Sequence, residues 1–255
     1  MPSVDTVRRF SNRVENYVRY RPGYPTAVYD TLRQYANLTA ASRIADIGSG
    51  TGILTRLLLE QGHTVVGVEP NKEMREASEQ LLGEFGGFTA VNATAEATTL
   101  PDHSLDLITA GQAFHWFNHA QARPEFMRVL KPGGWVGLVW NQRRMEDRPS
   151  MQAYEALMYK YSEQYEDLNQ ANSYPEIEPF FGQPPLTFTF DNVQLFDFDG
   201  LRGRFLSSSY APTPGHPLYE AAMADLQGVF EQWGENGRFP FIYITRLFLG
   251  QLNRH

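Results

Sequence analysis

Apolar residues follow two different spacings along the chain. Up to about residue 37 they recur at helical intervals, with Val7, Phe10 and Val14 in a first predicted helix and a second one over 26–35. From residue 43 onward, short apolar runs alternate with helical segments. The runs predict strands at 44–47, 64–68, 88–91, 105–110 and 135–140, and the segments predict helices at 53–61, 71–83 and 118–130.

Strands that alternate with helices are typical of a parallel sheet covered on both faces, so we predict a doubly wound α/β fold. The alternation stops after residue 141. The later pattern predicts a helix containing Met151 and Met158, strands at 186–190, 193–198 and 241–249, and a helix at 217–233.

We predict one domain over residues 1–255. Its expected parts are an N-terminal helical lid at 1–37, a cofactor-binding half at 38–141, a helical insertion at 142–185, and C-terminal strands with a helix that complete the sheet at 186–255. In open parallel sheets, ligands bind beyond the carboxyl ends of the strands. The loops that follow the predicted strands are therefore where we expect the chemistry.

The clearest chemical signal is a glycine-rich turn between the first predicted strand and the next helix, Asp46-Ile47-Gly48-Ser49-Gly50-Thr51-Gly52. Glycine permits positive φ and a close approach of backbone to ligand, and the start of a helix presents free N–H groups. The dinucleotide pattern G-x-G-x-x-G has its third glycine one residue later. A phosphate-binding P-loop needs Gly-Lys-Ser/Thr, whereas Ile53 follows Gly52 here.

An acid ends the second predicted strand. Glu69 follows the apolar run at 64–68 directly. A carboxylate in this place can accept hydrogen bonds from ribose hydroxyls, which is the role of an acid in nucleotide-binding sheets. By itself such an acid is usually just solvated, but next to the glycine-rich turn it indicates a ligand that contains adenosine.

Composition narrows the classes of function. The chain of 255 residues has no cysteine, which excludes disulfides, thiolate metal sites and a cysteine nucleophile. The net charge of −7 disfavours nonspecific binding of nucleic acid, and no apolar run approaches the roughly 18 residues of a membrane span. We therefore predict a cytoplasmic protein that binds a small molecule, with no nucleic-acid partner and no membrane partner.

With these motifs the sequence resembles the class I S-adenosylmethionine-dependent methyltransferases, whose loop reads acid-x-G-x-G-x-G and whose second strand ends in an acid. It is similar in particular to the methyltransferase type 11 and trans-aconitate methyltransferase-like group. The segments that carry this second similarity are Arg21-Pro22-Gly23-Tyr24-Pro25, Leu100-Pro101-Asp102, Gln112-Ala113-Phe114-His115-Trp116-Phe117, Arg128-Val129-Leu130-Lys131-Pro132-Gly133-Gly134 and Gly203-Arg204-Phe205-Leu206-Ser207-Ser208-Ser209-Tyr210. The resemblance implies a Rossmann-like, seven-stranded, mostly parallel sheet with helices on both faces and a helical cap insertion.

The resemblance also implies S-adenosyl-L-methionine as methyl donor and S-adenosyl-L-homocysteine as product. In the family, the glycines approach the amino-acid part of the cofactor, the acid before them serves its ammonium group, and the acid after the second strand binds the ribose. The loop after the third strand flanks adenine, and here Thr94 stands where members often have aspartate. The predicted cofactor-binding residues are Arg21, Asp46, Gly48, Ser49, Gly50, Thr51, Gly52, Glu69, Pro70, Met74, Thr94, Ala95, Glu96 and Gln112.

Methyl transfer from a sulfonium is an in-line displacement that needs alignment and a dry pocket. A carboxylate acceptor needs no base. A hydroxyl or a carbon acid does, and His115 is the candidate base, although a histidine between aromatics is commonly a packed core residue. The predicted acceptor contacts are Tyr17, Tyr20, Phe114, His115, Trp116, Arg204 and Tyr210. No metal is predicted, because Trp116 replaces the glutamate that the zinc-protease pattern requires.

We predict methyl transfer to a small organic molecule, with a carboxylate or hydroxyl acceptor favoured. Three alternatives stay open from the sequence. They are a carbon methyltransferase of quinone or polyketide type, a cofactor-binding module without catalysis, and a nicotinamide-dependent oxidoreductase on the same kind of sheet. The sequence does not predict the oligomeric state.

Overall fold

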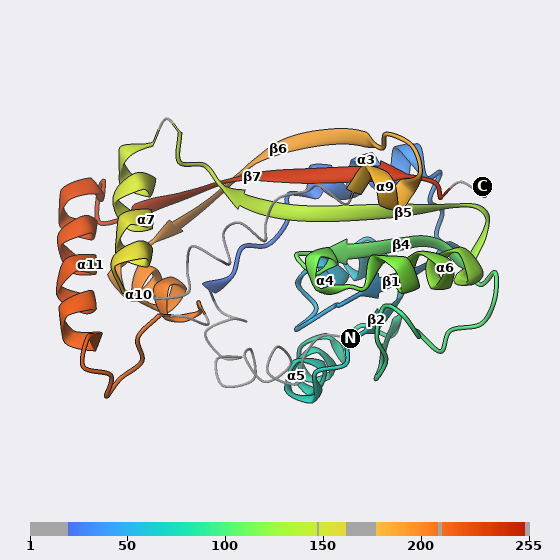
Figure 1. Ribbon diagram of the computed structural model, residues 1–255, viewed down its shortest axis with the longest axis horizontal. Coiled ribbons are helices and arrows are strands. Elements are labelled where there is room, and N and C mark those ends of the chain that lie inside the picture. Colours follow the sequence, from blue (N-terminus) through green and yellow to red (C-terminus); the bar gives the residue numbers. More distant parts are fainter. Residues whose placement is uncertain (1–19, 147, 162–176, 209–210, 253–255) are drawn as a thin grey trace.

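The computed structural model describes residues 20–146, 148–161, 177–208 and 211–252. Its centre is a seven-stranded sheet in the order β3-β2-β1-β4-β5-β7-β6 (Figure 1). The strands are β1 (Arg43–Ile47), β2 (Thr64–Val68), β3 (Phe88–Val91), β4 (Leu105–Gly111), β5 (Leu130–Arg143), β6 (Leu186–Phe196) and β7 (Phe239–Gly250). The first five strands are parallel, and β7 lies antiparallel between β5 and β6. The predicted doubly wound, mostly parallel sheet is confirmed.

The helices alternate with the strands through the first half of the chain and then form a group of their own. They are α3 (Thr26–Tyr35), α4 (Ile53–Leu59), α5 (Lys72–Leu82), α6 (His119–Val129), α7 (Pro149–Tyr161), α9 (Ile177–Phe181), α10 (Phe198–Leu206) and α11 (Tyr219–Trp233), with a 3-10 turn, η1, at Phe114–Trp116. Asn71, Asn118 and Asp197 begin three of them by accepting a backbone N–H with the side chain, so local sequence fixes these starts.

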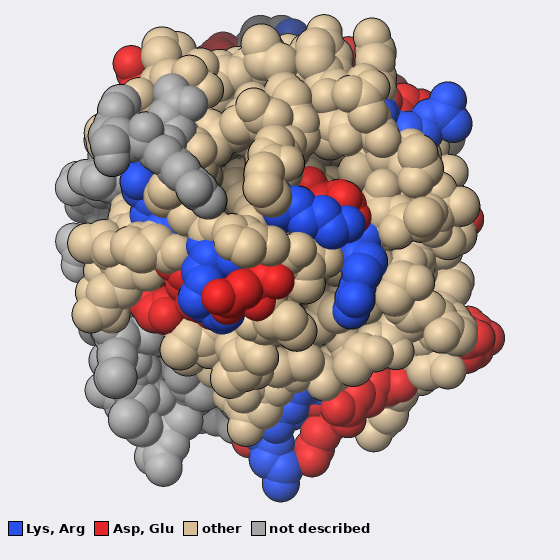
Figure 2. Space-filling model, turned by 90° about the vertical axis from the view of Figure 1, so that its right-hand side faces the viewer, with Lys and Arg blue, Asp and Glu red and all other residues tan. Residues whose placement is uncertain are grey.

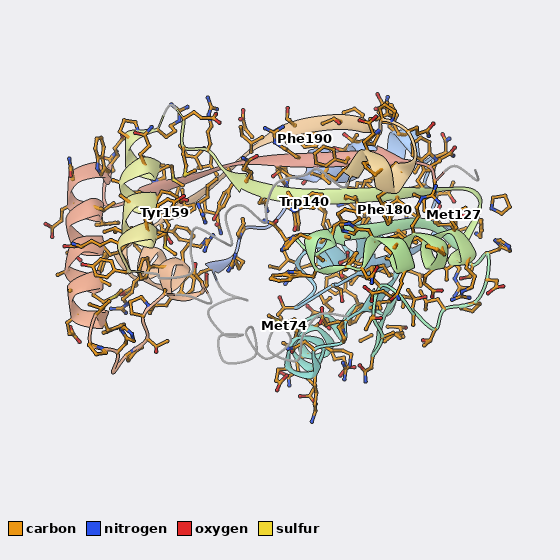
Figure 3. The ribbon with its side chains drawn as sticks, in the orientation of Figure 1. Met74, Met127, Trp140, Tyr159, Phe180 and Phe190 are labelled. Atoms are coloured by element: carbon orange, nitrogen blue, oxygen red, sulfur yellow. The ribbon has the colours of Figure 1, made fainter. Side chains whose placement is uncertain are left out.

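Two apolar cores lie on opposite faces of the sheet. One joins α6 and α9 to the strands, with Phe126, Trp140 and Phe180 among its members, and the other joins α3 and α4, with Leu32 and Leu58. Trp140 and Phe180 both pack edge-on against Phe114 (Figure 3). Burial on both faces explains why the central strands read as continuous apolar runs.

A third core builds a cap beyond the carboxyl ends of the parallel strands. There β6 and β7 extend past the rest of the sheet, and α7, α10 and α11 pack on this extension (Figure 1). Tyr154, Phe205 and Phe241 are fully buried in it. The helices α10 and α11 belong to the segment 186–255 that we expected to complete the sheet, and they lie in the cap together with α7.

Several element boundaries differ from the expectation. The runs 186–190 and 193–198 form one strand, β6, because the polar pair Asp191-Asn192 continues its pairing with β7. The strand β5 begins at Leu130, upstream of the predicted 135, with a register shift against β4. Sequence analysis did not predict α10, whose interior contains Gly200 and Gly203. The helix predicted from Val7 onward lies outside the described residues.

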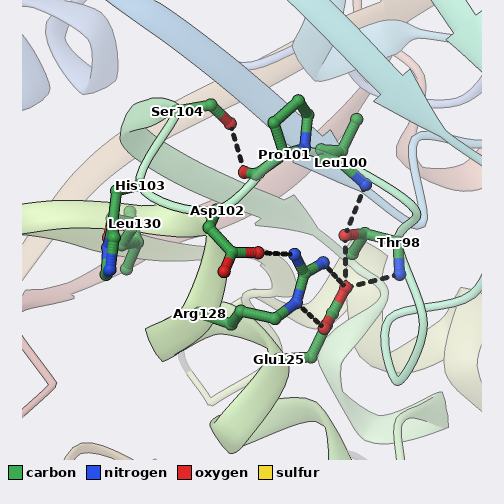
Figure 4. A network of polar contacts seen from close by, with 9 residues as sticks. All are labelled: Thr98, Leu100, Pro101, Asp102, His103, Ser104, Glu125, Arg128 and Leu130. Carbon is green, nitrogen blue, oxygen red and sulfur yellow. Dashed lines mark hydrogen bonds and ion pairs between the residues drawn. The ribbon is translucent and has the colours of Figure 1, made fainter.

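A polar network fastens the loop before β4 to α6 (Figure 4). Glu125 on α6 accepts hydrogen bonds from the backbone N–H and the hydroxyl of Thr98, at 2.8 and 2.5 Å. Arg128 donates to both Glu125 and Asp102. The guanidinium and the Thr98 donors hold the pKa of Glu125 down at about 2. Charge-assisted hydrogen bonds therefore hold this loop on α6.

Charges on the surface are mixed. Figure 2 shows basic and acidic side chains next to one another on the face seen from the right-hand side of Figure 1, separated by wide areas of other residues. That face carries no continuous basic patch among the described residues. No helix in the described part of the chain is both long and apolar enough to cross a membrane.

Candidate cofactor and acceptor site

The glycine-rich turn leaves β1 and crosses the carboxyl end of β2. Backbone N–H groups of Gly48 and Ser49 donate to the Val68 carbonyl at 2.8 and 3.1 Å, and Gly52 N donates to the Ser49 carbonyl at 2.9 Å. Gly48, Gly50 and Gly52 have φ of +67°, +56° and +87°. The turn needs a positive φ at every second residue, and glycine adopts positive φ without strain.

Glu69 is bound to this turn directly. Its Oε2 accepts the Gly50 N–H at 2.8 Å, and its Oε1 accepts the Asn71 N–H at 2.8 Å. The side chain is 8 % exposed. Burial raises the pKa of Glu69, and the two N–H donors oppose that rise. Since a carboxylate has about four acceptor positions, two donors leave room for further hydroxyl donors.

Asp46 lies beneath the turn and not on its surface. It is 1 % exposed, and its two oxygens accept the hydroxyls of Thr55 and Thr109 at 2.7 and 3.0 Å. Burial raises its pKa to about 6, with the nearby Glu69 carboxylate adding to the rise. Its direct contacts tie β1, β4 and α4 together, so any effect on a ligand passes through the turn.

The predicted adenine-flanking residues come from the loop after β3 and the start of α5. Pro70 and Met74 lie on either side of the capping residue Asn71, and Met74 is buried (Figure 3). Thr94 forms a bridge with the residue three positions later, which makes the loop after β3 a tight turn. Ala95 is buried within it. Both segments follow carboxyl ends of adjacent strands, so the fold brings them to the edge where the glycine-rich turn lies.

Glu96 has a partner in the protein. Its Oε1 accepts the backbone N–H of Asn118 at 2.7 Å, which fastens the loop after β3 to the start of α6. This contact positions the segment after β4, and it occupies an oxygen of a side chain that we expected near the cofactor.

In the segment after β4, one aromatic residue lies in the core and two others are partly exposed. Phe114 is 2 % exposed and stacks on the His119 ring at 4.1 Å, so its ring belongs to the core. His115 and Trp116 are only partly buried and contact each other, with ring centroids 4.7 Å apart. Gln112 has φ of +55° and donates through Nε2 to the Asn141 carbonyl at 2.9 Å.

The His115 imidazole is neutral. Burial lowers its pKa to about 4, and the neighbouring His119 lowers it further. Its Nδ1 is buried and has no hydrogen-bond partner among the described residues. The ring can therefore accept or donate one hydrogen bond at this edge of the sheet, but it does not supply a positive charge at neutral pH.

The residues 20–24 run along the cap and onto the sheet. Arg21 Nη2 donates to the Ser207 carbonyl at 3.1 Å, and the Tyr20 ring covers Gly203 so closely that a Cβ there would lie 2.0 Å from it. Farther on, the Tyr24 hydroxyl lies against Gly111 at the end of β4. Arg204 lies inside the cap on α10. Tyr17 and Tyr210, also predicted to contact the acceptor, lie outside the described residues.

A cleft of about 290 Å³ lies where this segment meets the glycine-rich turn. It is lined by Arg21, Gly23, Tyr24, Thr51, Gly52, Ile53, Arg56, Leu57, Glu60, Leu81 and Leu82. Arg21 thus shares this cleft with the last two residues of the turn, whereas Gly48, Gly50 and Glu69 do not line it. Within the described residues, no group of three or more histidines and acids is arranged to hold a metal ion.

Sequence reasoning missed Asn141, which joins these parts. Its Nδ2 donates to the Gly23 carbonyl at 3.1 Å, and its Oδ1 accepts from Thr245 at 2.5 Å and from Asn192 at 3.1 Å. Its carbonyl receives the Gln112 side chain. The signal was present, because a polar residue that ends an apolar parallel strand lies at the ligand edge of the sheet.

Comparisons with known proteins agree with this geometry. Residues 45–138, from β1 to within β5, match the family model described as a methyltransferase domain. That stretch is thus similar to a methyltransferase domain, and the strand order of the sheet fits the methyltransferase fold.

The relatives found include an uncharacterized methyltransferase of Mycobacterium tuberculosis, 43% identical over 134 residues, which are 52% of this chain and 52% of the relative. The chain therefore spans about half the length of this relative. A structure from Anaeromyxobacter dehalogenans, described as a candidate type II methyltransferase, is 20% identical with a TM-score of 0.67 over 92% of this chain and 100% of that one.

A second structure with this fold is a phosphoethanolamine N-methyltransferase of Haemonchus contortus, in complex with phosphomonomethylethanolamine and S-adenosylhomocysteine. It is 14% identical, with a TM-score of 0.54 over 98% of this chain and 59% of that one. At these identities both structures show the likeness of the fold alone.

Proposed function

We propose that this protein transfers a methyl group from S-adenosyl-L-methionine to a small organic molecule by direct in-line displacement. The observation that carries the proposal is the contact between Gly50 N and Glu69 Oε2 at 2.8 Å, which joins the glycine-rich turn to the acid after β2. The methyltransferase domain match supports it, as does the bound S-adenosylhomocysteine in the Haemonchus structure of the same fold.

The residues present fit such a cofactor. The hydroxyls of Ser49 and Thr51 are buried in the turn without a hydrogen-bond partner among the described residues, as expected for groups that a ligand satisfies. A Cβ on Gly50 would meet nothing within 4 Å, so the backbone faces open space at that point. Glu69 keeps acceptor capacity for the two ribose hydroxyls.

Bound at this site, the cofactor would supply a methyl group that its sulfonium already activates. The chain's own contribution is to bind, to orient and to exclude water. In our proposal Glu69 holds the ribose, the turn holds the amino-acid part, and Arg21 reaches its carboxylate. Thr94, Ala95, Pro70 and Met74 enclose the adenine.

The acceptor that fits best is a carboxylate. A general base works best with a pKa near the working pH, and His115, with a pKa of about 4, is a weak proton acceptor. A carboxylate gives up no proton on methylation, so it needs no base. For a hydroxyl acceptor, His115 is the residue that would accept the proton. Whether activity needs His115 therefore distinguishes a hydroxyl acceptor from a carboxylate acceptor.

The direct test is transfer of a labelled methyl group from S-adenosyl-L-methionine into small-molecule extracts, with the product identified by mass spectrometry. We expect one labelled product, and Glu69→Ala should abolish it while the surface variant Glu76→Ala forms it normally. If no extract yields a labelled product although the cofactor binds, the protein is a binding module and the proposal fails.

A separate comparison addresses the nicotinamide alternative. Only ligands that bind the native state raise the melting temperature. S-adenosyl-L-homocysteine should raise it and NAD should not. The reverse result would replace methyl transfer by hydride transfer as the function of the site.

A further inference from the structure

Arg204 is a buried cation whose recorded partners are neutral. It lies on α10 and is 2 % exposed. Its Nε donates to the Tyr243 hydroxyl at 2.9 Å, its Nη1 donates to the Ser207 hydroxyl at 3.2 Å, and its guanidinium lies 5.1 Å from the centre of the Phe241 ring. Within the described chain, no carboxylate pairs with it.

Other arginines lie close to this cation. Arg143, at the end of β5, is near enough to act on the charge of Arg204, and it forms an ion pair with Glu155 at 3.0 Å. Arg21 donates to the carbonyl of Ser207, whose hydroxyl Arg204 binds. The Glu155 carboxylate binds Arg143, and no ion pair joins it to Arg204 among the described residues.

A buried cation without a carboxylate partner is costly. Arginine does not give up its proton in proteins, and an unpaired charge away from water costs several kcal/mol. A guanidinium has five N–H donors in a planar fork, and Arg204 uses two of them in the bonds described above. The remaining donors suit the two oxygens of a carboxylate, which would also balance the charge.

We propose that Arg204 binds a carboxylate of the methyl acceptor, and that this carboxylate is an anchor distinct from the group that receives the methyl. The proposal rests on the proposed function for the identity of the acceptor, but the anion site itself does not depend on it. A carboxylate held by a guanidinium is a poorer nucleophile because its charge is shared, so methylation falls on a second group. The acceptor is thus at least bifunctional.

The position of Arg204 fits this role. Its partner Tyr243 pairs in register with Arg143 at the carboxyl end of β5, the end at which ligands bind in such sheets. Tyr20 covers Gly203, next to Arg204, and the same segment continues to the cleft beside the glycine-rich turn.

The competing explanation is that Arg204 only ties α10 to β7. The two explanations differ in what Arg204→Met does to the protein without ligand. Loss of a purely structural arginine lowers stability, since buried partners lose their bonds. Loss of an uncompensated charge leaves the melting temperature equal or higher, because an apolar side chain of similar volume replaces it.

The experiment is a titration of the melting temperature with sodium succinate, citrate and phosphate at constant ionic strength, against sodium chloride, without any cofactor. With a carboxylate we expect the melting temperature to rise with the logarithm of its concentration, by about 5–10 °C at a hundredfold excess over Kd. The rise should disappear in Arg204→Met. It should persist in the matched control Arg202→Met, whose exposed side chain pairs with Asp199 on the same helix.

Three results would overturn the proposal. They are no rise with a carboxylate above that with sodium chloride in the wild type, an equal rise in Arg204→Met, and equal rises with all salts, which would mean an adventitious ion only. If Arg204→Met does not fold, Arg204→Lys decides, because it keeps the charge and loses the fork; an affinity reduced less than tenfold would contradict an anchoring role. Cofactor binding measured separately keeps these outcomes apart from a failure of the proposed function.

Discussion

The glycines of the turn differ in what surrounds them. A Cβ on Gly52 would lie 2.4 Å from Leu82 Cδ1, and one on Gly48 would lie 2.6 Å from Ala113 Cβ. A Cβ on Gly50 would meet nothing within 4 Å. All three have positive φ, which costs other residues about 1–2 kcal/mol. Gly48 and Gly52 are therefore needed for close packing, and Gly50 leaves the surface of the turn open.

This difference gives a paired prediction. Gly52→Ala should destabilise the protein by about 2–4 kcal/mol, because a steric overlap adds to the backbone strain. Gly50→Ala should cost only about 1–2 kcal/mol in stability, yet it should weaken binding of S-adenosyl-L-homocysteine at least tenfold. Urea unfolding and calorimetric titration measure the two effects. Equal losses of stability would show that the surroundings of the glycines do not matter.

Asp46 predicts a dependence of stability on pH. Its pKa is about 6 in the folded chain and about 3.8 when unfolded, so the folded state holds more protons between these values. Stability from this residue is therefore greatest below pH 4 and falls as pH rises to 6, by about 3 kcal/mol in all. The free energy of unfolding of Asp46→Asn relative to the wild type should rise over this range. A difference that stays flat with pH would mean that Asp46 is ionised at pH 4 in the folded protein.

At the residue scale, motifs with a fixed backbone geometry could be predicted from the sequence. The glycine-rich turn and Glu69 lie next to each other, as their spacing indicated. Side-chain partners far apart in the chain could not be predicted. Nothing local to Glu96 or Asn141 indicates that one binds the Asn118 N–H and the other joins Gly23, Asn192 and Thr245.

At the scale of elements, the loop before β4 depends on its polar network. Glu125 has a pKa near 2, below its ordinary 4.5, so the folded state binds fewer protons between these values. Its contribution is present above pH 4.5 and is lost as the pH falls toward 2. Glu125→Gln should lower stability by about 1–2 kcal/mol at pH 7, after allowance for the solvent that screens Arg128 and Asp102.

The pH series provides the control for this variant. The deficit of Glu125→Gln should shrink as the pH falls from 4.5 and vanish below pH 2, where the Glu125 carboxyl is protonated and both side chains are neutral. A deficit that stays constant over this range would assign the effect to packing of α6 and not to charge.

The elements themselves were predictable to different degrees. The strands β1, β2 and β4 could be placed because burial on both faces makes them continuous apolar runs between turns. In the cap, α7 and α11 were predicted from their apolar spacing, but α10 and the packing of these helices on the ends of β6 and β7 were not. Which elements pack together leaves no mark on the local pattern, and the two glycines inside α10 hide that helix as well.

At the scale of the molecule, we assign different functions to the sheet and to the cap. The segment 45–138 that matches the methyltransferase family model supplies the glycine-rich turn and Glu69, whereas Arg204 and Tyr243 come from the part of the chain after it. In our proposals, the segment that is similar to relatives binds the methyl donor, and the cap selects the methyl acceptor. Exchange of the cap between relatives should change the acceptor and leave cofactor affinity within about threefold.

The central claim is that the glycine-rich turn and Glu69 form a binding site for the adenosine-containing methyl donor. Calorimetric titration of the protein with S-adenosyl-L-homocysteine tests it most directly. We predict one site per chain, with affinity reduced at least tenfold in Glu69→Ala and unchanged in Glu76→Ala. Absence of binding by the folded wild type, or equal affinity in Glu69→Ala, would contradict the claim.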